Sequence, residues 1–484
     1  MPGFHIENFG CRAARADGEA IAARLEASSC AASNPHTAEV VVVNTCSVTA
    51  EADREARAYI RRTHRRNPSA RIVVTGCYAQ RAPDELAALP GVAAVVGNSH
   101  KALAPQIAHN LMRGAGVESD RSLVRIEAMK SAGNVLLYSD DTFAHSFLEE
   151  AQVVPGAQTR PNLKIQEGCS NRCTFCVIPQ TRGNSRSLLP ENVIAQVRGF
   201  VAAGGRELVF SGINMGRWGR DLPPDPAAPR TLASLVRAIF EQTALPLLRL
   251  SSIEPMDWDD NLIALMRNYG GTRLCRHAHL PLQSGSDSVL RRMHRRYRPW
   301  HYAQKIESLL AAAASEITFG ADIMAGFPGE TDAEFKETLA FIRALPFGYL
   351  HLFPFSPRPG TRGWALHQQY PVPPQVVAER MSLLRSLAEE KMHAHRAQFI
   401  GRELNAITLH TPAALAQSGQ TAALTENFLP VEIAGTLPSN TPVSLRVTSL
   451  TSQSTLQAIP TDPQHHSLPE PLSPQDLLVH AFPN

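Results

Sequence analysis

Nine residues near the middle of the chain restrict its fold and chemistry more than any other stretch. Residues 168–176 (GCSNRCTFC) carry three cysteines within eight residues, directly after the strand-like run 163–166. Three thiolates at this spacing can bind three corners of a cubane iron–sulfur cluster and leave one iron without a protein ligand. Because a small molecule can bind such an iron, the segment predicts a reactive centre.

A zinc knuckle is the alternative interpretation of the same loop. Zinc sites in proteins normally have four ligands, and the sequence offers no fourth cysteine or histidine near the loop. The cluster is therefore favoured, with Cys169, Cys173 and Cys176 as metal ligands and as catalytic residues.

Cys11, Cys46 and Cys77 form a second set with a different pattern, since each follows its own strand-like run. The carboxyl ends of neighbouring parallel strands meet at one edge of a sheet, so cysteines far apart in sequence can meet there and hold a second cluster. Free cysteines are also often buried in hydrophobic cores, which leaves a purely structural role as the alternative.

Short β-branched runs alternate with helix-like stretches over most of the chain, which predicts an α/β protein of several domains. Six strand–helix units predict a central partial (β/α) barrel, with the cysteine loop at the carboxyl end of its first strand, where barrel active sites lie. Shorter alternating runs after it predict a small C-terminal β-barrel. We expect an N-terminal doubly wound α/β domain (1–118), a connector with a hairpin (119–160), the barrel (161–395), the β-barrel (396–460) and a flexible tail (461–484).

Charge is unevenly distributed along the 484 residues, whose formal net charge is +3. Residues 403–484 contain six acids and a single cation, Arg446, so they carry −5 and the rest of the chain about +8. A basic body allows a polyanionic partner. The sequence shows no signal peptide and no apolar run long enough to span a membrane, so we expect a cytoplasmic protein without membrane contact.

Six stretches of the sequence resemble one enzyme family: residues 165–169 (IQEGC), 182–187 (RGNSRS), 211–214 (SGIN), 249–255 (RLSSIEP), 279–285 (HLPLQSG) and 326–330 (GFPGE). Together with both cysteine sets, they resemble the methylthiotransferase family of radical S-adenosylmethionine (SAM) enzymes over most of the first 400 residues. The chain is most similar to the branch that modifies threonylcarbamoyladenosine in tRNA, because the isopentenyladenosine branch usually has SHP in place of SSIEP.

The resemblance implies two [4Fe–4S] clusters and SAM as cofactors, tRNA as substrate, and an electron donor such as flavodoxin or ferredoxin. The cluster at Cys169, Cys173 and Cys176 would cleave SAM to a 5′-deoxyadenosyl radical, which removes hydrogen from C2 of the adenine. The cluster at the second cysteine set would hold or supply the sulfur that is methylated and transferred.

Two features depart from the family pattern. Ala14 stands three residues after Cys11, where the family usually has asparagine, which affects a polar contact near the second cluster. The C-terminal module resembles the family's TRAM-like RNA-binding β-barrel, but its single cation is poor for phosphate binding.

Several residues outside the cysteine sets are candidates for cofactor contact. Gly204, Gly205 and Glu207 stand where a helix-like stretch enters a strand, and the resemblance implies a position near the SAM amino group; a plain helix cap is the alternative. Polar residues on or just after barrel strands are expected to face the cavity, because burial without a partner is costly. These are Ser252, Glu254, Gln283 and Asp322.

Two arginine-rich runs, residues 61–66 and 291–296, can contact phosphate or can form ordinary solvated helix faces. Arg182 and Arg186 follow the cysteine loop and are placed to steer a polyanion toward it. The predicted RNA-binding residues are Arg182, Arg186, Arg295 and Arg296.

Two other functions remain as alternatives. The same chemistry can act on another tRNA adenosine or on an aspartate of a ribosomal protein. A non-catalytic RNA-binding protein that uses the cysteines for zinc is the alternative from another class.

Overall fold

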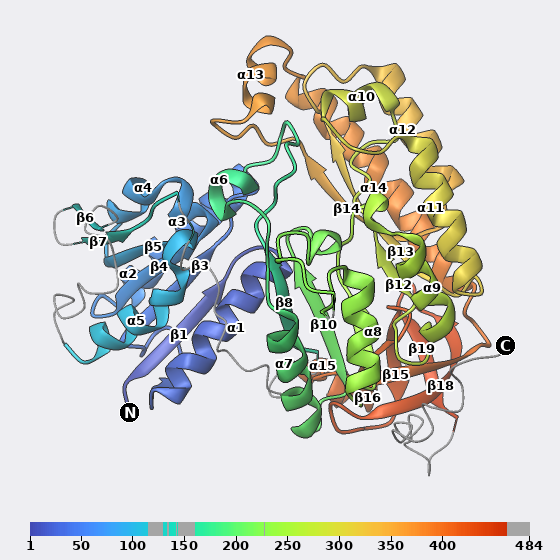
Figure 1. The fold of residues 1–484 in the computed structure, drawn as a ribbon, viewed down its shortest axis with the longest axis horizontal. Helices are drawn as coiled ribbons and strands as arrows, with labels where there is room; N and C mark the ends of the chain where they lie inside the picture. The colour runs from blue at the N-terminus through green and yellow to red at the C-terminus, as the bar shows by residue number, and fades with distance from the viewer. Residues whose placement is uncertain (115–128, 133–134, 142, 144–159, 227, 462–484) are drawn as a thin grey trace.

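The computed structural model describes residues 1–114, 129–132, 135–141, 143, 160–226 and 228–461. These residues form an N-terminal sheet, a central open barrel and a closed C-terminal β-barrel (Figure 1). The predicted α/β class with a small C-terminal barrel is therefore confirmed. Most of the predicted connector, and the predicted tail after residue 461, lie outside the described residues.

Seven strands form the N-terminal sheet in the order β2-β1-β3-β4-β5-β7-β6. Every neighbouring pair is parallel except β6 and β7, an antiparallel pair from the predicted connector that extends the sheet. The strands are β1 (Gly3–Asn8), β2 (Ala31–Ala32), β3 (Val40–Thr45), β4 (Arg71–Gly76), β5 (Val92–Gly97), β6 (Met129–Ala132) and β7 (Val135–Tyr138). The helices are α1 (Arg12–Ala27), α2 (Ala50–Arg66), α3 (Cys77–Arg81), α4 (Pro83–Ala87), η1 (Asn98–Leu103) and α5 (Ala104–Met112).

The run of four valines in β3 explains why helices cover both faces of this sheet. Successive strand residues point to opposite faces. Val40 and Val42 pack with residues of α1 and α5, whereas Val41 and Val43 pack with residues of α2 and α4. Because both sets are fully buried, the strand is stable only between two helical layers.

The central region contains six parallel strands in two sheets, β11-β10-β8 with a short antiparallel β9 at the edge, and β12-β13-β14. Backbone bridges Leu248–Leu274 and Ser252–His279 join the sheets into one open barrel. The strands are β8 (Asn162–Glu167), β9 (Arg186–Ser187), β10 (Glu207–Gly212), β11 (Leu247–Leu250), β12 (His277–His279), β13 (Thr318–Ala325) and β14 (Phe347–Pro354).

Most helices of the central region lie on the outside of the barrel strands, whereas α6 (Ile178–Arg182) lies against α3 of the N-terminal domain (Figure 1). The others are α7 (Pro190–Ala202), η4 (Met215–Arg217), α8 (Leu232–Gln242), η5 (Pro255–Asp257), α9 (Asp260–Tyr269), α10 (Asp287–Arg292), α11 (Pro299–Ala312), α12 (Asp332–Ala344), α13 (Arg362–Gln369) and α14 (Pro374–Ala397). Helix α12 starts with a capping box, in which Thr331 and Glu334 each accept a backbone N–H of the other. Within the described residues, no helix combines the length and apolar character needed to cross a membrane.

The C-terminal barrel is closed in the order β15-β16-β17-β19-β18. Its elements are β15 (Glu403–Thr408), α15 (Ala413–Gln417), β16 (Gln420–Thr425), β17 (Pro430–Ala434), β18 (Pro442–Leu450) and β19 (Leu456–Pro460). Inward residues of all five strands form its hydrophobic core.

The turn between β16 and β17 closes the amino end of the central barrel. Phe428 stacks on His277, the first residue of β12, with ring centroids 4.2 Å apart. Arg249 donates to the carbonyl oxygens of Thr425 and Glu426 at 3.2 and 3.1 Å. The Glu426 carboxylate in turn accepts from Arg276 Nε at 2.7 Å. The C-terminal barrel therefore covers the amino end of the central barrel, opposite the cysteine loop.

Candidate active site

Cys169, Cys173 and Cys176 lie in the loop after β8 and line a cavity of about 180 Å³ at the carboxyl end of the central barrel. The other lining residues follow several different strands, as in barrel active sites generally. They are Asn171, Phe175, Ile178, Ile213, Asn214, Ser252, Glu254, Pro281, Gln283, Arg295 and Asp322.

Three hydrogen-bond donors point at the sulfur atoms of this loop. The backbone N–H of Asn171 and Nδ2 of Asn214 donate to Cys169 Sγ at 3.4 and 3.6 Å. Arg295 Nη1 donates to Cys173 Sγ at 3.1 Å. Donors to the sulfur atoms favour the thiolate form and tune the potential of an iron–sulfur cluster.

Burial works against the thiolate form in the absence of metal. It raises the pKa of the Cys169 thiol and raises the pKa of Cys176 to about 12, in both cases with a smaller contribution from neighbouring cysteines. Metal-ligating sulfur is deprotonated, so iron binding would release these protons.

The donor set fits a four-iron cluster with one open iron. The cavity lining contains three cysteines and no histidine. Polar side chains of Ser252, Glu254 and Gln283 line the same cavity, so an oxygen- and nitrogen-bearing ligand such as SAM could be held beside the sulfur atoms.

The second set of cysteines comes together at the carboxyl edge of the N-terminal sheet. Cys46 directly follows β3 and Cys77 directly follows β4, and both are buried, while Cys11 is exposed just before α1. Burial raises the pKa of Cys46 to about 12, with further contributions from the Cys77 and Cys11 thiols.

The backbone around this second set of cysteines packs closely against it. Gly10 has a φ of +106°, and a Cβ there would lie 2.5 Å from Cys46 Cβ, so only glycine fits. Arg182 Nε and Asn98 Nδ2 donate to Cys77 Sγ at 3.2 and 3.4 Å. Three sulfur atoms with two donors can hold a second cluster that again lacks a fourth protein ligand.

A buried cluster of charges lies between the two cysteine sets. Asp17 and Glu167 are its acids, and Arg182, Lys101 and Lys164 are its cations, all of them with side chains less than one-tenth exposed. Burial alone would raise the pKa of both carboxyls, but the three cations outweigh it and hold each pKa below its ordinary value.

This ion cluster corrects the prediction that Arg182 contacts RNA. Arg182 is fully buried, pairs with Glu167 at 2.5 Å and donates to Cys77. It therefore links the loop after β8 to the second cysteine set and is not accessible to a phosphate.

Arg295 is also buried, because it spans Cys173, Glu254 and the ring of Tyr297. Its predicted phosphate contact is therefore incompatible with the structure. Arg296 is partly exposed and lies 3.3 Å from Asp257 Oδ1.

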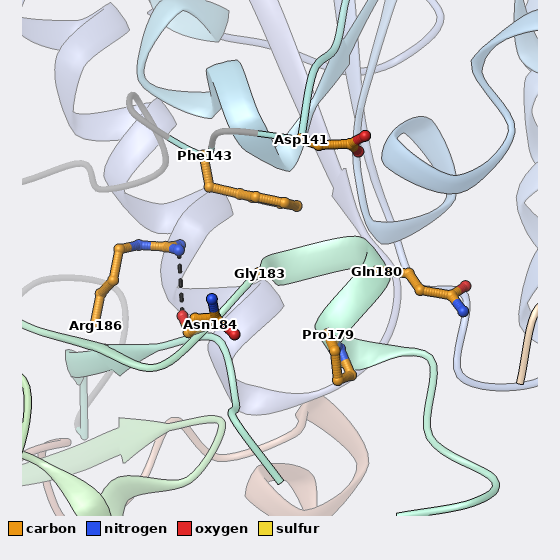
Figure 2. Close-up of a pocket in the computed structure, with 7 residues that line it drawn as sticks. All are labelled: Asp141, Phe143, Pro179, Gln180, Gly183, Asn184 and Arg186. Carbon is orange, nitrogen blue, oxygen red and sulfur yellow. Dashed lines mark hydrogen bonds between the residues drawn. The ribbon is translucent and has the colours of Figure 1, made fainter. Parts of the chain in front are cut away.

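Arg186 lines a second pocket of about 520 Å³ beside α6, at the junction between the N-terminal sheet and the central barrel (Figure 2). Its guanidinium lies over the Phe143 ring and donates to the Asn184 carbonyl oxygen at 3.2 Å. The other lining residues are Asp141, Pro179, Gln180 and Gly183.

The structure divides the predicted cofactor-binding residues into two groups. Ser252, Glu254 and Gln283 line the cavity beside the cysteine loop, as does Asp322. Glu254 accepts from Asn171 at 3.1 Å and pairs with Arg295 at 3.1 Å.

Gly204, Gly205 and Glu207 lie at the other end of the barrel, and the prediction that they contact SAM is wrong for this structure. Glu207 is the first residue of β10, which runs parallel to β8, whereas the cysteine loop follows the last residue of β8. Glu207 is fully buried in an ion pair with Arg249 at 2.6 Å. Gly204, with a φ of +82°, ends α7, so the helix-cap alternative holds.

Asn214 is a site residue that the predicted set omits. Its side chain contacts Cys169 Sγ, and its backbone N–H donates to Gln166 Oε1 at 2.7 Å. The signal was present, because Asn214 ends one of the stretches that resemble the family (211–214) and follows a barrel strand.

Comparisons with known proteins agree with this architecture. Residues 3–97 match a family described as "Uncharacterized protein family UPF0004", and residues 163–342 match the radical SAM superfamily. A solved structure of the radical SAM methyltransferase TsrM from Kitasatospora setae covers 72% of this chain and 72% of its own, with a TM-score of 0.52 and 15% identity, which supports the fold alone.

Curated relatives are more similar. The threonylcarbamoyladenosine tRNA methylthiotransferase MtaB of Bacillus subtilis is 34% identical over 401 residues, which cover 83% of each chain. The MtaB protein of Rickettsia prowazekii is 32% identical over 433 residues, which cover 88% of this chain and 90% of the relative. With the two cysteine sets at the carboxyl edges of their sheets, this chain therefore belongs to the MtaB-type branch of the radical SAM methylthiotransferase family.

Proposed function

We propose that this protein is a tRNA methylthiotransferase that adds a methylthio group to C2 of N6-threonylcarbamoyladenosine. The observation that carries the proposal is the presence of two separate three-cysteine sites, joined by one buried ion cluster, in a chain that matches such enzymes over more than four-fifths of its length.

Each site has its own role in this proposal. Cys169, Cys173 and Cys176 hold the [4Fe–4S] cluster that, when bound, supplies the electron for SAM cleavage. Ser252, Glu254, Gln283 and Asn214 line the cavity beside these cysteines and would hold SAM there. Cys11, Cys46 and Cys77 hold the second [4Fe–4S] cluster, which carries the sulfur to be transferred.

The tRNA reaches the site from the open carboxyl end, because the turn at Phe428 closes the other end. Arg186, Arg296 and the exposed arginines at the end of α2 are the proposed phosphate contacts. The C-terminal barrel contributes little charge, since its cation Arg446 already pairs with Glu403 at 2.6 Å. An electron donor such as flavodoxin or ferredoxin, and a cytoplasmic location, complete the proposal.

The function is tested by mass spectrometry of tRNA nucleosides from a deletion strain. The methylthio derivative of threonylcarbamoyladenosine should disappear, its unmodified precursor should accumulate, and re-expression should restore the product. If the methylthio group persists on threonylcarbamoyladenosine while a ribosomal-protein aspartate loses its modification, the protein substrate is correct and the tRNA proposal fails.

A further inference from the structure

Three potential metal ligands on neighbouring strands of the central barrel face one another and have no role in the chemistry described above. His279 of β12, Asp322 of β13 and His351 of β14 offer ligand atoms that all lie within 4.8 Å of one another. Within the described residues, no other group of three such side chains meets this criterion.

Strand register explains why these side chains converge. Asp322 and His351 are direct partners on β13 and β14. His279 is paired with Gly320, two residues before Asp322 on the same face of β13, and the Tyr349 ring packs over Gly320. Three neighbouring parallel strands thus present one carboxylate between two imidazoles.

The two Asp–His distances match a four-coordinate metal centre. Asp322 Oδ1 lies 3.3 Å from His279 Nε2 and 3.4 Å from His351 Nδ1. Two ligands of a tetrahedral zinc ion with bonds near 2.0–2.1 Å are separated by about 3.3 Å. Each Asp–His distance is therefore consistent with an edge of a zinc tetrahedron.

The buried histidine also lacks other partners. His279 is 7% exposed, and neither of its ring nitrogens has a hydrogen-bond partner among the described residues. A buried polar atom without a hydrogen bond costs about 1–3 kcal/mol. Nε2 lies 3.3 Å from Asp322 Oδ1, and a metal ion between the two atoms would be bound by both.

We propose that His279, Asp322 and His351 bind a divalent transition-metal ion, with zinc as the best match, and leave a coordination position open toward the active-site cavity. Two imidazoles and one carboxylate are the ligand set of open, catalytic-type zinc sites. Asp322 lines the cavity that contains the cysteine loop, so the ion lies at the edge of the SAM space.

The open position accepts an oxygen donor from the substrate. This step rests on the proposed function, in which the threonyl carboxylate of the substituent on N6 is the available oxygen anion. The ion then fixes the substituent and, through it, the adenine relative to the cysteine loop, so the three ligands act as positioning residues for the reaction.

The metal site is tested on the full-length protein with both clusters loaded anaerobically. One equivalent of Zn²⁺ is added, the protein is desalted, and zinc and iron are measured by mass spectrometry. Wild type should retain about one zinc with its iron unchanged. His351→Ala should bind zinc more than about tenfold more weakly, since even loss of a second-shell partner costs about 10–100-fold in affinity.

Matched variants make the outcome decisive. His351 is exposed, so its loss should leave iron content and folding intact, and His393→Ala, an exposed histidine on α14, should bind zinc like wild type. The proposal is overturned if His351→Ala and wild type retain equal amounts of zinc. It is also overturned if zinc uptake is accompanied by an equal loss of iron, because the zinc would then be bound by the cysteines. Anomalous diffraction at the zinc edge locates the ion.

The substrate role is tested separately. In the zinc-loaded enzyme, His351→Ala should raise KM for threonylcarbamoyladenosine tRNA by about tenfold or more, whereas His393→Ala should keep the wild-type KM. Zinc binding by a wild type that does not modify this tRNA would refute the proposed function and preserve the metal site. Zinc binding with an unchanged KM in the variant would refute the substrate role.

Discussion

The two cysteine sets reach similar donor arrangements by opposite routes. Cys169, Cys173 and Cys176 lie in one loop of the central barrel, so local chain geometry brings them together. Cys11, Cys46 and Cys77 come from three separate places along the N-terminal sheet, and only the parallel order of β1, β3 and β4 brings them together. The first set thus depends mainly on spacing in sequence and the second on the tertiary fold.

The largest expected effect is the loss of the loop cluster. Cys173→Ala should abolish 5′-deoxyadenosine formation and reduce iron from about eight to about four per chain, because two four-iron clusters become one. Iron analysis and product chromatography measure both. Cys30→Ala, a buried cysteine outside both sets, is the control and should retain about eight irons.

Cys46→Ala should separate the two sites. The loop cluster remains, so SAM cleavage continues, but methylthio transfer to tRNA should stop, with iron again near four per chain. The assay is 5′-deoxyadenosine formation measured beside methylthio product in the same reaction. Full transfer by this variant would mean that the second set is only structural.

Gly10→Ala tests whether the second set depends on the surrounding backbone. The new Cβ would lie 2.5 Å from Cys46 Cβ at a φ of +106°, so this site should deform and lose most of its iron while SAM cleavage persists. Gly199→Ala in helix α7 has open space around the new Cβ and should leave iron content unchanged. Equal iron content in both variants would contradict the dependence on this close approach.

Arg182→Met removes the side chain that joins the two sites. Loss of one partner from a buried ion cluster is expected to destabilise the fold by about 3 kcal/mol. Because Asp17 and Glu167 have lowered pKa values, their stabilising contribution is present above their ordinary pKa of about 4 and is lost as pH falls through the folded-state pKa. The variant should raise those folded-state pKa values and shift acid unfolding to higher pH, as urea titrations across pH would show.

The smallest effects concern the sulfur contacts. Asn214→Ala removes a donor to Cys169 and should slow SAM cleavage about fivefold, equivalent to about 1 kcal/mol, without loss of iron. Asn98→Ala removes a donor to Cys77 and should slow transfer and not cleavage. If each variant slowed both steps equally, the two sites would not be functionally separate.

The same contrast explains what the sequence could predict. The spacing of the loop cysteines is enough to predict the first site from the sequence. The pattern of a cysteine after each strand predicts the second site once a parallel sheet is assumed. The sequence does not predict the burial of Arg182, because its partners Asp17 and Cys77 lie 165 and 105 residues away and only Glu167 is near it in the chain. The convergence of His279, Asp322 and His351 depends on strand register, which composition does not reveal.

Glu207 illustrates a different difficulty. A glycine pair before an acid at a helix–strand junction resembles a ligand-binding turn, yet β10 begins there, at the end of the barrel opposite the cysteine loop. Gly204 is needed to end helix α7, and Glu207 is needed to neutralise the buried Arg249. Whether a residue begins or ends a barrel strand can be read from the sequence, and this decides between a helix cap and a ligand-binding turn.

The stacking of Phe428 on His277 covers the end of the catalytic chamber that lies opposite the cysteine loop. In the proposed function, tRNA covers the other end, so a small reactant is expected to bind before the tRNA and its fragments to leave after it. This expected order of binding would depend in part on a turn of the C-terminal barrel, far along the chain from both cysteine sets.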